Sequence, residues 1–77
     1  MNISTEDRVE YWRKKFKVGS EWLTVEFKPR TITIVHIEYL TDVDSVVVIY
    51  LYNQYPEILE FLPINQFIDG RFVRVVK

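Results

Sequence analysis

The apolar positions of the chain follow two patterns in succession, first with the spacing of a helix and then with the spacing of strands. Val9, Trp12 and Phe16 are spaced i, i+3 and i+7, so they form one stripe along a helix. Gly19 follows as a stop signal, because glycine readily adopts the left-handed conformation that ends helices. The pattern therefore predicts one helix over about residues 5–16.

Beyond this helix, apolar and polar side chains alternate with a period of two, which predicts strands. Five strands are expected, at about residues 22–28, 31–40, 45–52, 57–62 and 71–76. In the first strand, Leu23, Val25 and Phe27 are the expected buried face. In the second, we expect Thr33, Val35, Ile37 and Tyr39 on one face and Ile34, His36 and Glu38 on the other. Tight turns join the strands, with a turn of 3₁₀ helix expected near Pro63.

The third strand, VVVIYLY at 46–52, carries apolar side chains on both of its faces. A strand with one face in water alternates apolar and polar residues, so this strand needs cover on each side. We expect the interior of a barrel to cover one face. The helix stripe of Val9, Trp12 and Phe16 is expected to cover part of the other face, so that no partner is needed.

One helix followed by five short strands predicts a mainly β fold with one N-terminal α-helix, in which a small five-stranded barrel closes and removes exposed strand edges. With 77 residues the chain has room for a single domain, 1–77, with the helix at about 5–16 and the barrel at about 20–76. The segments GSEW, TITIVHI, VVVIY and FLPINQF, in that order, resemble small SH3-like barrels of phage-encoded and uncharacterised bacterial proteins. Val48 and Tyr50 match a "VxY" strand, and Leu62, Pro63 and Phe67 match an "LPxxxF" corner.

This resemblance implies an SH3-like barrel of phage or phage-like origin. It also implies a small stand-alone protein that binds and inhibits a host or defence protein. The chain lacks the ALYDY-type segment of eukaryotic signalling SH3 domains, so a proline-rich peptide is not the expected ligand.

The composition indicates a folded protein without disulfides, but it does not indicate a function. The chain is 48% hydrophobic and has no cysteine, so we expect an apolar core without disulfides or thiolate metal sites. The first residues are charged where a secretory signal has its apolar core, and the run at 46–52 is too short to span a bilayer. We therefore expect a cytoplasmic protein that does not enter a membrane, as a monomer or a small homo-oligomer.

Charged residues are unevenly distributed along the chain, although the net charge is only −1. The span from Thr31 to Gly70 contains acidic residues but neither lysine nor arginine, which predicts an acidic side of the molecule. Tyrosines beside carboxylates are typical of protein contact surfaces. We therefore expect a protein partner with a basic surface, bound through Glu38, Asp42, Asp44, Tyr52, Tyr55, Glu57 and Glu60.

Two alternatives stay open. The basic residues Arg13, Lys14, Lys15 and Lys17, which alternate with aromatic residues, predict a nucleic-acid-binding barrel that uses the end of the helix. Lysines at a helix C-terminus are also ordinary partners of the helix dipole, and the net charge is not basic, so protein binding is preferred. The second alternative, assembly through paired strand edges, applies if the helix leaves the central strand partly uncovered.

Catalysis and cofactor binding have little support in the sequence. His36 and Glu38 share a strand face, but no nucleophile is placed beside them. Asp42 and Asp44 lack the glycine and the distal glutamate of a calcium loop. We expect a protein that is not an enzyme, with no cofactor and no metal.

Overall fold

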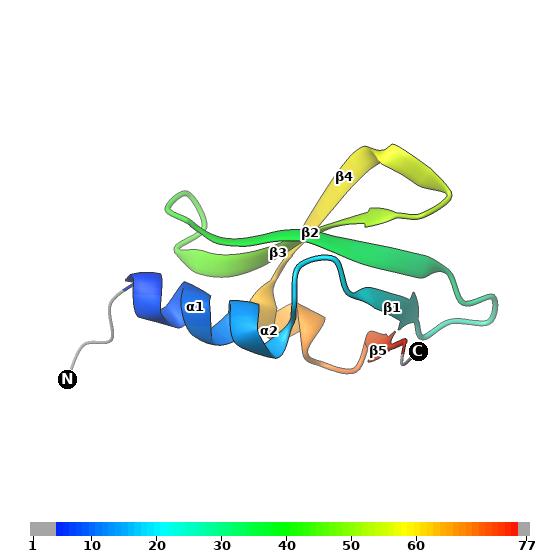
Figure 1. Ribbon diagram of the computed structural model, residues 1–77, viewed down its shortest axis with the longest axis horizontal. Coiled ribbons are helices and arrows are strands. Elements are labelled where there is room, and N and C mark those ends of the chain that lie inside the picture. The colour runs from blue at the N-terminus through cyan, green and yellow to red at the C-terminus, as the bar shows by residue number, and fades with distance from the viewer. Residues whose placement is uncertain (1–4, 76–77) are drawn as a thin grey trace.

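The computed structural model describes residues 5–75 of the chain. Its elements are α1 (Thr5–Lys15), β1 (Glu21–Thr24), β2 (Thr31–Leu40), β3 (Ser45–Tyr52), β4 (Tyr55–Pro63), α2 (Ile64–Phe67) and β5 (Phe72–Arg74). The strands form one antiparallel five-stranded sheet in the order β4-β3-β2-β1-β5. Both helices lie on one side of β2 and β3, and β4 rises away from them (Figure 1).

The predicted mainly β fold with an N-terminal helix is confirmed, whereas closure of the sheet into a barrel is not. β4 and β5 are the outermost strands, and within residues 5–75 each pairs with a single neighbour. The consecutive elements β4, α2 and β5 therefore lead from one edge of the sheet to the other. Because Phe67 of α2 is buried in the core, this connection crosses the face of the sheet that carries the core.

α1 forms where the apolar stripe predicted it, and the stripe packs on the sheet. Val9 and Phe16 are buried in the core, and Trp12 packs against it. Arg13 ties the helix to the sheet, because its Nε donates a hydrogen bond to the carbonyl oxygen of Ile37 in β2 at 3.0 Å. Packing of this stripe, more than helix propensity, stabilises a helix this short.

Gly19 turns the chain from the helix into β1. Its φ of 90° lies in the left-handed region, which glycine adopts without strain. Its N–H donates to the carbonyl oxygen of Ile34 at 2.7 Å, so the turn is anchored on β2.

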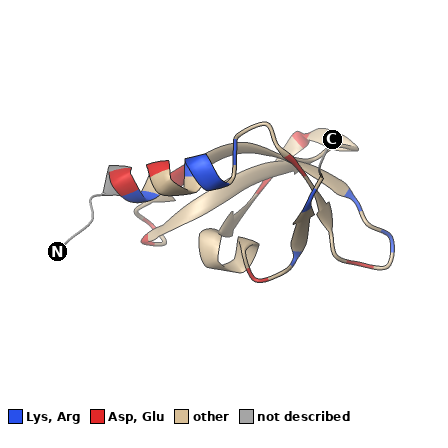
Figure 2. Cartoon of the chain, turned by 60° about the horizontal axis from the view of Figure 1, so that its bottom comes forward, with Lys and Arg blue, Asp and Glu red and all other residues tan. Residues whose placement is uncertain are grey.

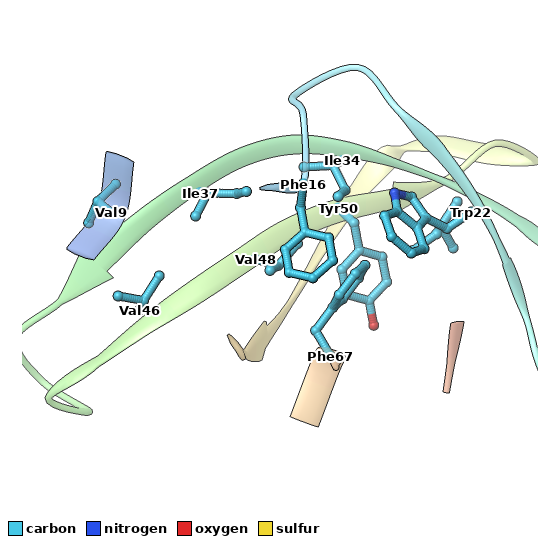
Figure 3. Close-up of a cluster of buried hydrophobic side chains, with 10 residues drawn as sticks. Val9, Phe16, Trp22, Ile34, Ile37, Val46, Val48, Tyr50 and Phe67 are labelled. Carbon is cyan, nitrogen blue, oxygen red and sulfur yellow. The ribbon is translucent and has the colours of Figure 1, made fainter. Parts of the chain in front are cut away.

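An aromatic cluster joins segments that are far apart in the sequence. The ring of Phe67 has centroid distances of 5.6 Å to Phe16, 5.3 Å to Trp22 and 4.6 Å to Phe72. Figure 3 shows Phe16, Trp22 and Phe67 gathered beside Tyr50 of β3. Each such ring pair contributes about 0.5–1.5 kcal/mol beyond the area that it buries, so the cluster is a large part of this small core.

β1 is shorter than predicted, and the prediction of its buried face is wrong. Trp22 and Thr24 are buried, whereas Leu23, Val25 and Phe27 are exposed. The reason is the aromatic cluster, in which Trp22 takes the core side of the strand. Alternation along the strand then directs Leu23 outward.

A β-bulge at Val35 divides β2 into two halves with opposite alternation. The register with β3 shifts between Ile34 and His36, so one extra residue enters β2. Ile34 and Ile37 are therefore both buried on the core side, although strict alternation predicts opposite faces for them. The predicted faces are correct within each half of β2 and wrong across the bulge.

Phe16→Ala and Phe27→Ala remove the same ring from sites with exposed fractions of 8% and 96%. We expect Phe16→Ala to lower the free energy of unfolding by about 3–5 kcal/mol, because it leaves a cavity in the aromatic cluster. Phe27→Ala should change it by about 0.5 kcal/mol or less. Denaturant unfolding followed by tryptophan fluorescence measures both values, and equal losses would contradict this assignment of the core.

Candidate functional site

β3 has two apolar faces, and the fold covers only one of them well. Val46, Val48 and Tyr50 lie in the core together with Val9 and Phe16 from the helical segment. We call this the inner face of the sheet and the opposite one the outer face. The helix stripe and the core thus lie on the same face of β3, and the prediction that the helix covers the second face is wrong.

The outer face of β3 joins β4 in an exposed apolar surface. Ile49 lies opposite Phe61 in the ladder, and Leu51 lies opposite Leu59. The two β3 residues are half-buried, while Leu59 and Phe61 are 58% and 56% exposed. Val47, further along the same face, is fully buried, so the exposed surface begins at Ile49. We call Ile49, Leu51, Leu59 and Phe61 the outer patch.

β4 is a long edge strand with little cover on either face. Every residue from Tyr55 to Phe61 is exposed, although the strand pairs with β3 along one side. Its other side pairs with no strand in the described part of the chain. Such an edge presents unpaired backbone N–H and C=O groups to which another strand can bind. β4 therefore offers backbone and apolar side-chain contacts together.

Three of the predicted acidic residues lie on β2 and β4. Glu57 and Glu60 are exposed on β4, and Glu38 lies on the outer face of β2. Glu60 is opposite Tyr50 in the ladder. Burial, with smaller contributions from the Tyr52 hydroxyl and the Glu60 carboxylate, raises the pKa of Tyr50 to about 12. Glu60 therefore lies on the inner face of β4, so the negative charge follows the β4 edge rather than surrounding the outer patch.

Asp42 and Asp44 lie apart from that edge, in the turn at the opposite end of β3 from Tyr55. A strand of this length separates the two ends by about 25 Å. Asp44 has a φ of 47° and accepts a hydrogen bond from the hydroxyl of Tyr39, which raises the pKa of Tyr39. Acidic positions accordingly occur at both ends of the long β2–β3 hairpin rather than in one cluster (Figure 2).

The two predicted tyrosines lie together where β3 turns into β4. Tyr52 and Tyr55 are opposite each other in the ladder, and Tyr55 is the more exposed. The guanidinium of Arg30 lies 4.4 Å from the ring centroid of Tyr52. A hydrogen bond from Arg30 Nε to Glu26 Oε2 at 3.1 Å raises the pKa of Arg30, and bonds from Thr24 and Arg30 lower the pKa of Glu26. Tyr52 is thus held by the β1–β2 loop.

His36 and Glu38 form an ion pair on the outer face when the histidine is protonated. His36 Nε2 lies 3.2 Å from Glu38 Oε2, and both side chains are about half exposed. Pairs of this kind contribute about 0–1 kcal/mol. Across residues 5–75, no three histidine or acidic side chains come together in a group that could hold a metal ion.

The predicted nucleic-acid-binding residues are Arg13, Lys14, Lys15 and Lys17. Arg13 bonds to the carbonyl of Ile37 and, through Nη1, to Glu10 Oε1 at 2.8 Å. Lys15 Nζ lies 5.7 Å from the ring centroid of Trp12. Phe16 lies in the core and Trp12 packs against it, so neither ring is free to stack on bases, whereas Tyr11 is 55% exposed.

No protein family, curated protein or solved structure matches the chain. Neither helix within the described residues has the length and apolar character needed to cross a membrane. The candidate site therefore follows from geometry, which points to the outer patch and the free edge of β4.

The apolar members of the outer patch were not among the residues predicted to bind a partner. The segment ILEFL at 58–62 has apolar side chains on both strand faces, as VVVIY does at 46–50. That signal was present in the sequence, but apolar residues in a strand are assigned to the core by default.

Asp44→Ala removes the acceptor for Tyr39 and places alanine at a positive φ, whereas Asp42→Ala changes a neighbouring turn carboxylate without either effect. The left-handed backbone costs an ordinary residue roughly 1–2 kcal/mol, so we expect Asp44→Ala to lower the melting temperature clearly. Asp44→Asn should keep it close to that of the parent, since asparagine tolerates this backbone. Thermal unfolding by circular dichroism makes the comparison, and equal melting temperatures for the two alanine variants would exclude a structural role of Asp44.

Proposed function

We propose that the protein is a small non-enzymatic binding module that takes an extended segment of a partner protein onto the β4 edge and the outer patch. One observation carries this proposal, namely that β4 is exposed from Tyr55 to Phe61 while it bears apolar side chains on both faces. Strand addition of this kind gains affinity from main-chain hydrogen bonds and specificity from alternate side chains.

The charge of the surface supports a basic partner. Glu57 and Glu60 lie on β4, and no lysine or arginine occurs between Thr31 and Gly70. A segment that fits has apolar side chains at every second position, over Leu59 and Phe61, and lysine or arginine beside the glutamates. Complementary charge of this kind speeds association and excludes acidic competitors.

Steric occlusion is the proposed mode of action. A partner segment that pairs with β4 has one backbone edge and one side-chain face covered, so other molecules cannot bind it there. Tyr55, exposed at the start of β4, extends the contact surface beyond the outer patch. The one-turn helix α2 lies where the "LPxxxF" corner is expected, which supports a relation to SH3-like barrels with the sheet left open. The half-exposed His36–Glu38 pair fits a surface ion pair and supports the non-enzymatic assignment.

A synthetic peptide of about ten residues that alternates valine and lysine tests this proposal against one that alternates valine and glutamate. We expect the basic peptide to bind and to shift the amide resonances of β4 and β3 in ¹⁵N-edited NMR spectra. Leu59→Ser with Phe61→Ser should weaken binding by about tenfold or more, which corresponds to about 1.4 kcal/mol.

Val18→Ser with Val43→Ser is the matched control, because it makes the same kind of change at exposed positions away from β4. This control should leave binding unchanged. Equal binding of the two peptides, or resonance shifts confined to α1, would overturn the proposed function.

A further inference from the structure

The two free edges of the sheet carry opposite charge. β4 bears Glu57 and Glu60 and no cation, whereas Arg71 and Arg74 lie at the two ends of β5. Arg71 is paired with Asp69 at 3.2 Å, and the guanidinium of Arg74 lies over a tryptophan ring of the core. Pairing two β4 edges brings glutamates together, and pairing two β5 edges brings arginines together, so only unlike edges attract.

We propose that β4 of one copy of this chain pairs with β5 of a second copy, which extends the sheet from molecule to molecule. This inference rests on the proposed function in one respect, because it uses the same β4 edge, and it names a second copy as the partner. The basic, partly apolar strand that β4 requires is present in the chain itself as β5. The opposite charges of the two edges favour β5 of a second copy as the strand that pairs with β4.

β5 is long enough for such pairing, although its assigned strand has only three residues. Its ladder with β1 continues on both sides, because Val25 N–H donates to Arg71 O and Val75 N–H donates to Glu21 O, each at 2.9 Å. The backbone from Arg71 to Val75 is therefore extended along β1. Its far side pairs with no other strand in residues 5–75.

β4 and β5 run in the same direction, because each neighbouring pair of strands in the sheet is antiparallel and three strands lie between them. Joining β5 of one copy to β4 of the next, with the outer faces on the same side, therefore gives a parallel contact. Val73 lies opposite Leu23 on the outer face, and it is exposed as Leu59 is. Placing Val73 opposite Leu59 of the next copy also places Arg74 opposite Glu60 and Phe72 opposite Ile58. Apolar side chains then meet apolar ones, and the cation meets the carboxylate. An antiparallel arrangement turns one copy over and sets outer-face residues beside inner-face residues, so the parallel one is preferred.

This contact joins two different surfaces, so each added copy exposes another free β4 and another free β5. Heterologous contacts of this type produce closed rings when the rotation between copies closes and open filaments when it does not. The outer patch then continues into Val73 and Leu23 of the neighbouring copy, which reduces its exposure to water. The chain therefore associates beyond a dimer.

Cysteine cross-linking tests the contact directly, because the chain contains no cysteine. A mixture of Leu59→Cys copies and Val73→Cys copies should form a mixed disulfide under mild oxidation. Leu59→Cys mixed with Phe27→Cys is the control, since Phe27 is more exposed than Val73 and favours random collision. A control yield equal to that of the Leu59–Val73 mixture, or preferential homodimers of either single variant, would overturn the inference.

A charge exchange provides the second test. Glu57→Lys with Glu60→Lys makes both edges basic, and Arg71→Glu with Arg74→Glu makes both edges acidic. Each double variant alone should associate about tenfold more weakly than the parent in sedimentation velocity, because like charges then meet. An equimolar mixture should recover association, because each variant supplies the edge that the other lacks. Circular dichroism verifies that the variants fold. If the Arg71→Glu, Arg74→Glu variant does not fold, the cysteine cross-linking still tests the contact.

The two proposals fail separately. A parent chain that remains monomeric at every concentration, while the basic peptide still binds β4, overturns the self-assembly and leaves the binding function intact. Association that the charge exchange abolishes and the mixture restores, without any binding of the basic peptide, supports self-assembly and rejects a separate partner.

Discussion

Phe67 lies against Phe16, Trp22 and Phe72, with ring-centroid distances from 4.6 to 5.6 Å. These rings come from α2, the end of the helical segment, β1 and β5, so one cluster holds together four parts of the chain. All of them lie on the inner face of the sheet. A chain of 77 residues buries only a thin core, and within residues 5–75 the outer face from Ile49 into β4 is left partly exposed.

The sequence was sufficient to predict the elements whose spacing is regular. The stripe of Val9, Trp12 and Phe16 defined the helix, and β2 and β3 have the predicted bounds because their β-branched runs end at clear turns. Periodicity shows which residues share a face, but not on which side of a sheet a distant element will pack. The placement of α1 on the inner face therefore needed the structure, as did the bulge at Val35, where no glycine or proline marks the irregularity.

The candidate site was predicted in part. Tyr55, Glu57 and Glu60 do lie together along β4, since they are close in sequence and share one strand. Asp44 was placed in the same surface by its charge alone, whereas its backbone conformation and its bond to Tyr39 make it a turn residue. Leu59 and Phe61 were not among the predicted binding residues, because a closed barrel was expected and closure would have buried the edge on which they lie.

The separation of charge along the sequence survives folding because of the strand order. β2, β3 and β4 form a continuous meander within the span from Thr31 to Gly70, which lacks lysine and arginine. β1 precedes this span and β5 follows it. The connection through α2 carries the chain across the inner face, from the acidic edge to the edge that holds Arg71 and Arg74. Phe67 anchors that crossing in the core, so α2 lies between the ends of β4 and β5 within one molecule. The same ring that completes the core thereby leaves two edges of opposite charge unpaired, and each is complementary to the other edge of a second copy.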